Sequence, residues 1–204
     1  MKVAWSNPRQ VPVIPILLLI NTTILLASYS YRLSFEENGS IENAQVFILL
    51  CSMIGFLYAS FATQLKPFAM LCTVICFAFL LREIDIEDLN IPNLAKLLFS
   101  GNGKYITVLT LVCPTLYWTL KRYSLTYLVR NIVHHFIKFA VLISILFILS
   151  WIFDKGVIQT NQNAMLEELC ELNAYMLIFF ISILYINLFS RRQSQDLPGS
   201  LEGQ

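Results

Sequence analysis

Ionisable residues gather where three long apolar runs of this chain begin or end. They are Glu42 at the start of the second run, Arg82, Glu83 and Asp85 at the end of the third, and Glu168 and Glu171 just before the sixth. Ionisable side chains are costly at membrane depth, and they usually face the interior of a helix bundle or a wet cavity. Carboxylates with amide oxygens nearby are the ligands that Ca²⁺, Mg²⁺ and Mn²⁺ prefer. The sequence therefore predicts one ligand-binding polar site from these six residues, with the five acids as candidate ligands of a divalent cation.

A simpler interpretation of the same acids stays open. Acidic side chains in the first turn of a helix are stabilised by the helix dipole, which accounts for Glu42, Glu167 and Glu168 without any ligand. Glu83 and Asp85 close a run and oppose that dipole. Arg82 would offset them, and we expect its guanidinium to pair with a neighbouring carboxylate, because a charge at the hydrocarbon edge needs a partner or a route to water.

Six apolar runs must position these residues. The runs are Val11 to Tyr31, Ile41 to Thr63, Phe68 to Leu81, Tyr105 to Leu120, Phe136 to Phe153 and Leu172 to Phe189. A helix needs ~20 residues to cross a hydrocarbon core of ~30 Å, and only the third run is clearly short of that length. Continuous apolar segments of this kind satisfy their backbone groups as helices.

The predicted fold is therefore an all-α, polytopic transmembrane bundle of about six membrane-spanning helices. A short interfacial helix is expected within Leu89 to Ser100, where apolar residues recur at helical spacing. Residues 1–192 would form a single transmembrane domain, and 193–204 a disordered polar cytoplasmic tail. A composition with only 13% charged residues is typical of a membrane protein, since soluble domains carry about 25%.

Basic and acidic residues separate when the segments that connect the apolar runs are assigned alternately to the two sides of a membrane. One side then carries nine basic and two acidic residues, and the other carries five basic and eleven acidic residues. Short loops rich in Lys and Arg stay in the cytoplasm, so we expect a multi-pass inner-membrane protein with both termini cytoplasmic. The first run could instead be a cleaved signal peptide, although Pro12 and Pro15 and the lack of a clear cleavage site favour a retained helix.

Several other chemistries find no support in the sequence. His134 and His135 are adjacent, which suits neither a chelating pair nor a catalytic site. The intramembrane hydroxyls of Ser144, Ser150 and Ser182 have no base at helical spacing, and we expect them to bond to their own helix backbone. There is no basic, aromatic-interleaved patch for nucleic acid. No catalytic residue can be assigned.

Three short motifs resemble a known group of proteins. They are Glu-x-Gly-x-x-Glu over residues 37–42, Arg-Glu-x-Asp over 82–85 and Glu-Glu-x-x-Glu over 167–171. Together they are similar to those of small, uncharacterised bacterial inner-membrane proteins. The resemblance implies an envelope protein with several spanning helices and no assigned activity. The chain departs from membrane hydrolases of the alkaline ceramidase type, because it lacks their intramembrane His-x-x-x-His pair.

Three functions remain open at this point. The acidic site could bind or transport a cation or a cationic group. The chain could be a membrane-embedded, metal-dependent enzyme acting on a lipid or a lipid-linked substrate. It could also be a non-enzymatic subunit of an envelope complex, with other membrane proteins as partners besides the lipid bilayer.

Overall fold

The computed structural model describes residues 21–22, 39–63, 65–84, 86, 90–130, 134–160 and 162–195, and every regular element within them is helical. The helices are α2 (Ser40–Ala62), α3 (Lys66–Glu83), α4 (Asn93–Phe99), α5 (Gly101–Arg122), α6 (Leu125–Leu128), α7 (His134–Asp154) and α8 (Asn163–Gln195). The all-α fold class is thereby confirmed. Most of the predicted first run lies outside the described residues, as do the end of the predicted tail, 196–204, and Asp85.

Three of these helices are long and apolar enough to cross a membrane: Ser40–Ala62, Phe136–Asp154 and Asn163–Leu188. Six spanning helices are not supported. The short third run gains length in α3 only by taking in Lys66, Arg82 and Glu83, and α5 takes in charged residues at both of its ends. The apolar part of such a helix is therefore shorter than the ~20 residues that a bilayer requires, although the helix itself is longer.

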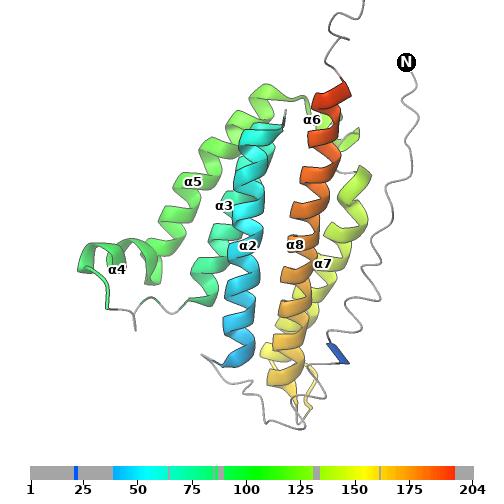
Figure 1. Ribbon diagram of the computed structural model, residues 1–204. Helices are drawn as coiled ribbons and strands as arrows, with labels where there is room; N and C mark the ends of the chain where they lie inside the picture. Colours follow the sequence, from blue (N-terminus) through cyan, green and yellow to red (C-terminus); the bar gives the residue numbers. More distant parts are fainter. Residues whose placement is uncertain are drawn as a thin grey trace, which may run out of the picture.

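α2, α3, α7 and α8 run side by side and form a bundle (Figure 1). α2 packs against both α3 and α8, and α7 packs against the other side of α8. α5 leans on α3, and the short α4 contacts α5. The chain therefore brings the start of α2, the end of α3, the end of α7 and the start of α8 to the same end of the bundle.

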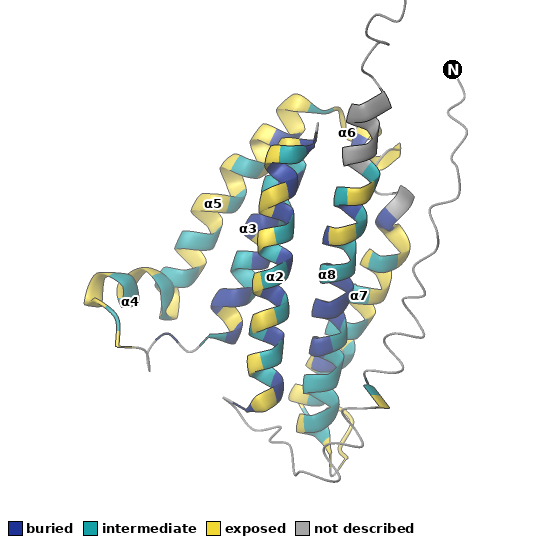
Figure 2. Ribbon diagram, viewed as in Figure 1, coloured by how far each residue is buried: buried dark blue, intermediate teal, exposed yellow. Residues whose placement is uncertain are grey.

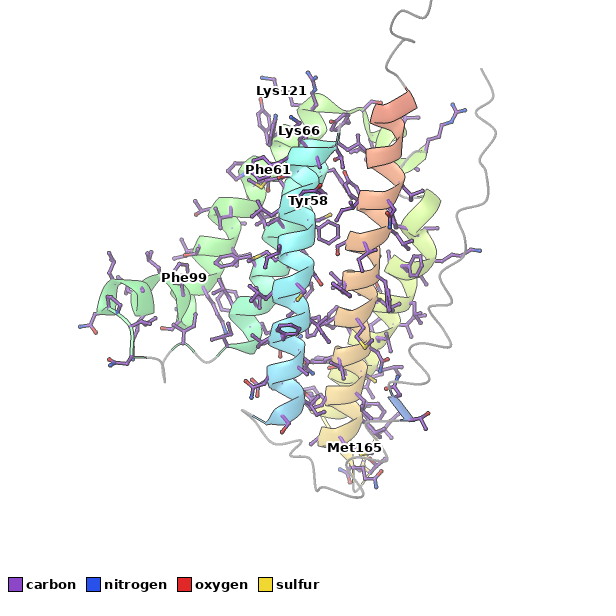
Figure 3. All side chains as sticks on the ribbon, in the orientation of Figure 1. Tyr58, Phe61, Lys66, Phe99, Lys121 and Met165 are labelled. Atoms are coloured by element: carbon purple, nitrogen blue, oxygen red, sulfur yellow. The ribbon has the colours of Figure 1, made fainter. Side chains whose placement is uncertain are left out.

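The bundle interior is built mainly from residues of α2, α3 and α8, with further contributions from α6 and α7. Leu49, Phe56, Cys76, Tyr175 and Tyr185 are all essentially buried there. Figure 2 shows these inner faces as buried and most of α4 and α5 as exposed. On the outward side of α2, Tyr58 and Phe61 are exposed, as expected of surfaces that face lipid (Figure 3).

The helix ends follow local sequence signals. Pro67 stands in the first turn of α3, where its missing N–H costs nothing. Gly101 has a φ of 48°, which a glycine adopts without strain, and it separates α4 from α5. α4 confirms that a short helix lies within Leu89 to Ser100, and none of its residues is buried.

The last helix begins earlier than the sequence predicts. The sixth apolar run begins at Leu172, but α8 already begins at Asn163. Asn163 shapes the turn from α7, since its Nδ2 donates to the carbonyls of Phe153 and Ile158 and its Oδ1 accepts from the Thr160 N–H. As a result Glu168, Glu171 and Tyr175 lie on one face of a continuous helix.

The two ends of the bundle differ in charge. The end where α8 begins carries the acids of α2, α3, α7 and α8, and Met165 marks it in Figure 3. The opposite end carries Lys66 and Lys121, also labelled there, with no acidic residue close by in the described helices. We refer to the first as the acidic end.

One close approach between α2 and α8 gives a testable prediction. A Cβ added at Gly55 would lie 2.8 Å from Ser182 Oγ and 3.2 Å from Ser182 Cβ. We expect Gly55→Ala to lower the free energy of unfolding in detergent by ~1–3 kcal/mol, because the two helices must shift apart. Adding Ser182→Ala should recover part of the loss, and Ile54→Ala, on the exposed side, should change little. An unaltered stability in Gly55→Ala would contradict this packing.

Candidate functional site

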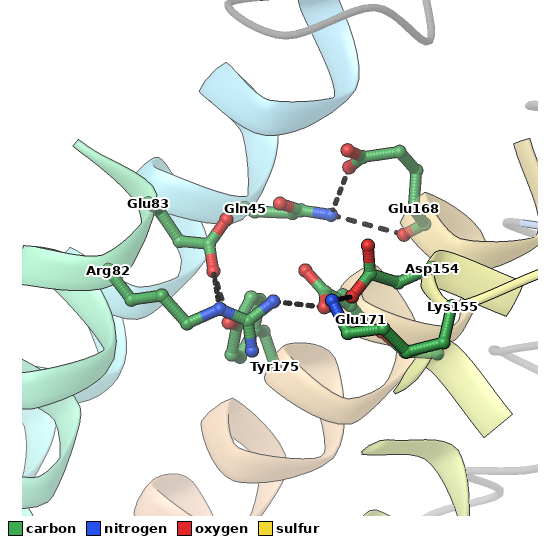
Figure 4. Close-up of polar contacts among 9 residues, drawn as sticks. Gln45, Arg82, Glu83, Asp154, Lys155, Glu168, Glu171 and Tyr175 are labelled. Atoms are coloured by element: carbon green, nitrogen blue, oxygen red, sulfur yellow. Dashed lines mark hydrogen bonds and ion pairs between the residues drawn. The ribbon is translucent and has the colours of Figure 1, made fainter. Parts of the chain in front are cut away.

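Arg82 lies at the centre of a polar cluster at the acidic end (Figure 4). Its Nε lies 3.4 Å from Oε1 of Glu83, the next residue on α3. Its Nη2 forms an ion pair with Oε1 of Glu171 on α8. The predicted pairing of Arg82 with a neighbouring carboxylate is confirmed, and it joins two helices that are distant in the sequence.

Both carboxylates of this ion pair are buried and receive further hydrogen bonds. Glu83 is 8% exposed and Glu171 is 4% exposed. The Tyr175 hydroxyl donates to Glu83 Oε1 at 2.5 Å, and the Ser150 hydroxyl donates to Glu171 Oε1 at 2.6 Å. Buried charges persist only when they are paired and hydrogen-bonded, so these four contacts explain how two carboxylates remain inside the bundle.

The expectation for Ser150 was wrong, whereas those for two other serines are confirmed. Ser144 and Ser182 donate to carbonyls of their own helices. Ser150 instead reaches across to Glu171, because α7 packs against α8 at this height. The role of Tyr175 was not predicted either. Its only sequence signal is its position four residues after Glu171, on the same helix face.

A second contact ties α2 to α8. Gln45 is fully buried, and its Nε2 donates to Glu168 Oε2 at 2.8 Å and to the Glu168 backbone carbonyl at 3.1 Å. The other amide atom, Gln45 Oε1, is buried and accepts no hydrogen bond from the described residues. In Figure 4 this amide lies between Glu83 and Glu168. The cluster therefore holds one buried acceptor that still lacks a donor.

Other acids complete the charge of the site. Glu42, Glu83 and Glu171 all repel the Glu168 carboxylate, so the four lie within electrostatic reach of one another. Arg82 is the one cation that the described contacts place on these carboxylates. Lys155 forms an ion pair with the adjacent residue, Asp154. The Lys155 Nζ lies 2.7 Å from Asp154 Oδ2, and this hydrogen bond raises the pKa of Lys155.

The predicted site residues are thus only partly accounted for. Arg82, Glu83, Glu168 and Glu171 lie in the cluster with Glu42 nearby, and Asp85 lies outside the described residues. A ligand-binding role for them stays a prediction. The part of the chain that the structure describes contains no group of three or more His, Cys, Asp or Glu residues that could hold a metal ion.

The reason for the missing metal-binding group is visible in the contacts. Oε1 of Glu83 contacts the Arg82 guanidinium and accepts from the Tyr175 hydroxyl. Oε1 of Glu171 contacts the same guanidinium and accepts from the Ser150 hydroxyl. Oε2 of Glu168 accepts from the Gln45 amide N–H. One oxygen of each carboxylate is therefore already occupied by hydrogen-bond donors, whereas the ligands of a divalent cation would have to direct their oxygens to the ion.

Comparison with known proteins adds no further information on the site. No family model, no curated protein and no solved structure matches this chain. The resemblance to small bacterial inner-membrane proteins stays a prediction from the three motifs. The fold and the site define the class of protein on their own: a helical bundle with three helices able to cross a membrane and a buried ion-pair cluster at one end.

Proposed function

We propose that the protein is an integral membrane protein that binds a cation or a cationic group at the acidic end of its bundle. α3 is antiparallel to α2 and contributes to the same core, so Arg82 and Glu83 lie at the depth where the spanning helices end. Ionisable residues at such a depth are functional candidates by default. The proposal includes an inner-membrane location with both termini cytoplasmic, which follows from the distribution of Lys and Arg.

The observation that carries the proposal is the charge balance around Glu168. Its carboxylate is half-buried and is repelled by Glu42, Glu83 and Glu171. Among the described residues, the Arg82 guanidinium contacts Glu83 and Glu171 but not Glu168, whose carboxylate receives one hydrogen bond, from the neutral Gln45 amide. Like-charged carboxylates held together are stabilised by a cation, and Glu168 is where the described cluster offers one a place.

The test is a cation series on purified protein in detergent. At constant ionic strength, replacing tetramethylammonium chloride by methylammonium or sodium chloride should raise the melting temperature, because a ligand that binds only the folded state stabilises it by about 2.7 kcal/mol at a hundredfold excess over Kd. Glu168→Gln should remove this response. Glu167→Gln makes the same change in charge one residue away and should keep it.

Two results would contradict the proposal. One is a melting temperature that does not depend on which cation is present. The other is an equal response in the parent protein and in Glu168→Gln, which would place the cation elsewhere.

A further inference from the structure

The unused acceptor in the cluster indicates what kind of cationic group the site takes. We infer that it is the primary ammonium of an ethanolamine phospholipid headgroup, bound beside Gln45 Oε1 and the Glu168 carboxylate, with its phosphate beside Arg82. This inference rests on the proposed function and narrows its ligand to one chemical class.

The first argument is the state of the Gln45 side chain. Gln45 is fully buried, and its Nε2 is used twice, for the carboxylate and the carbonyl of Glu168. Those two bonds fix the amide so that Oε1 points away from Glu168 and toward the Glu83 side of the cluster (Figure 4). A buried carbonyl oxygen without a donor is unfavourable, and nearly all such groups in folded proteins have a partner. Among the described residues, therefore, no N–H or O–H group donates to this oxygen.

The second argument is the hydrogen-bonding character of the groups around that oxygen. Glu168 accepts the Gln45 bond through Oε2, and the described residues give its Oε1 no donor. Both contacts to Glu83 likewise go to its Oε1. The oxygens without a donor among the described residues, Glu168 Oε1 and Glu83 Oε2, are therefore hydrogen-bond acceptors on acidic side chains. A primary ammonium carries three N–H donors, a positive charge and no acceptor, whereas a trimethylammonium group carries no donor at all.

The third argument concerns Arg82. The Arg82 Nε contacts Glu83 and Nη2 contacts Glu171. The third nitrogen, Nη1, has no acceptor among the described residues. The Arg82 side chain as a whole is 47% exposed. Guanidinium N–H groups bind phosphate oxygens well. A ligand with an ammonium and a phosphate a short distance apart would satisfy Gln45, Glu168 and Arg82 together.

The place of the cluster agrees with such a ligand. Glu168 lies in the second turn of α8, which is long and apolar enough to cross a membrane, and Arg82 lies in the last turn of α3 at the same end of the bundle. Phospholipid headgroups occupy the zone just outside the hydrocarbon core. A free amine of the same chemistry could also reach the site from water, and the test separates these two sources.

The test compares headgroups that differ only in N-methylation. The full chain is placed in nanodiscs that contain equal amounts of phosphatidylethanolamine and phosphatidylcholine with the same acyl chains, and the lipids retained after transfer to detergent are quantified by mass spectrometry. We expect phosphatidylethanolamine to be retained at least about fivefold over phosphatidylcholine, since the choline headgroup loses a charge-assisted hydrogen bond. Mono- and dimethylated headgroups should fall between the two.

Variants then locate the selectivity. Gln45→Leu removes the acceptor and Glu168→Gln removes the charge, and each should reduce the retention ratio to about one. Glu167→Gln should keep the parent ratio. Because Gln45→Leu could unfold the protein, its melting temperature is measured alongside, and Glu168→Gln provides the independent readout.

Each outcome decides between the two proposals. Equal retention of the two lipids by the parent protein overturns the headgroup inference. If methylammonium still raises the melting temperature in detergent, the proposed cation site stands and its ligand is a soluble amine. If neither lipid selectivity nor a response to soluble cations is found, both proposals fail.

Discussion

Replacing Arg82 by alanine is expected to lower the free energy of unfolding by about 2–4 kcal/mol. Loss of the guanidinium leaves Glu83 and Glu171 as neighbouring carboxylates, 8% and 4% exposed, without their shared cation. The range lies below that of a fully buried ion pair because the Arg82 side chain is 47% exposed and partly screened. Chemical unfolding of the purified protein in detergent measures the effect.

A matched control and a double variant test whether the loss of stability in Arg82→Ala comes from the ion-pair cluster. Lys138→Ala removes an exposed cation near the opposite end of α7 and should leave stability nearly unchanged. Adding Glu171→Gln to Arg82→Ala should restore part of the loss, because one of the two uncompensated charges disappears. A stability of Arg82→Ala equal to that of the parent would mean that the carboxylates are solvated, and that the cluster is not a buried site.

Replacing Tyr175 by alanine should have the largest effect of any single change in the core, about 3–5 kcal/mol. Tyr175 is fully buried, its ring packs against Phe79 and Phe147, and its hydroxyl donates to Glu83. Tyr175→Phe keeps the ring and removes only the hydroxyl, so it should cost about 1–3 kcal/mol. The difference between the two variants separates ring packing from the hydrogen bond.

Tyr185 offers a control at the far end of the same helix. It is also fully buried, and its hydroxyl donates to the Leu65 carbonyl at 3.0 Å. The effects of Tyr175→Phe and Arg82→Ala should not add, since both residues hold Glu83, whereas those of Tyr185→Phe and Arg82→Ala should add. Additive effects in both pairs would argue against a single connected network.

The sequence predicts the helices well where apolar residues are continuous. α2 and α7 begin and end within a few residues of the predicted runs, because both runs are predominantly apolar along their length. It overestimates the number of spanning helices, because α3 reaches its length only by including Lys66, Arg82 and Glu83. The sequence also places the start of α8 too late, because the apolar run begins only at Leu172, whereas a turn around Asn163 begins the helix before the acidic residues.

The candidate site was predictable only in its charges. A guanidinium between acids at a helix end needs a partner, and this sufficed to expect the contacts of Arg82. The neutral members of the cluster give no comparable signal, because Tyr175, Ser150 and Gln45 could equally have faced lipid or their own backbone. Their roles depend on which helices are neighbours and on how each is rotated, which the sequence does not specify. Asn21 is a further example, since it exchanges two hydrogen bonds with Asn173 on α8.

The central claim is that Glu168 and its neighbours form one cation-binding site, and a calorimetric titration of methylammonium into the detergent-solubilised protein tests it most directly. The account predicts saturable binding with one site per chain in the parent protein and in Glu167→Gln, and no saturable binding in Glu168→Gln. Heats that are the same in all three proteins, or that arise only from dilution, would contradict it.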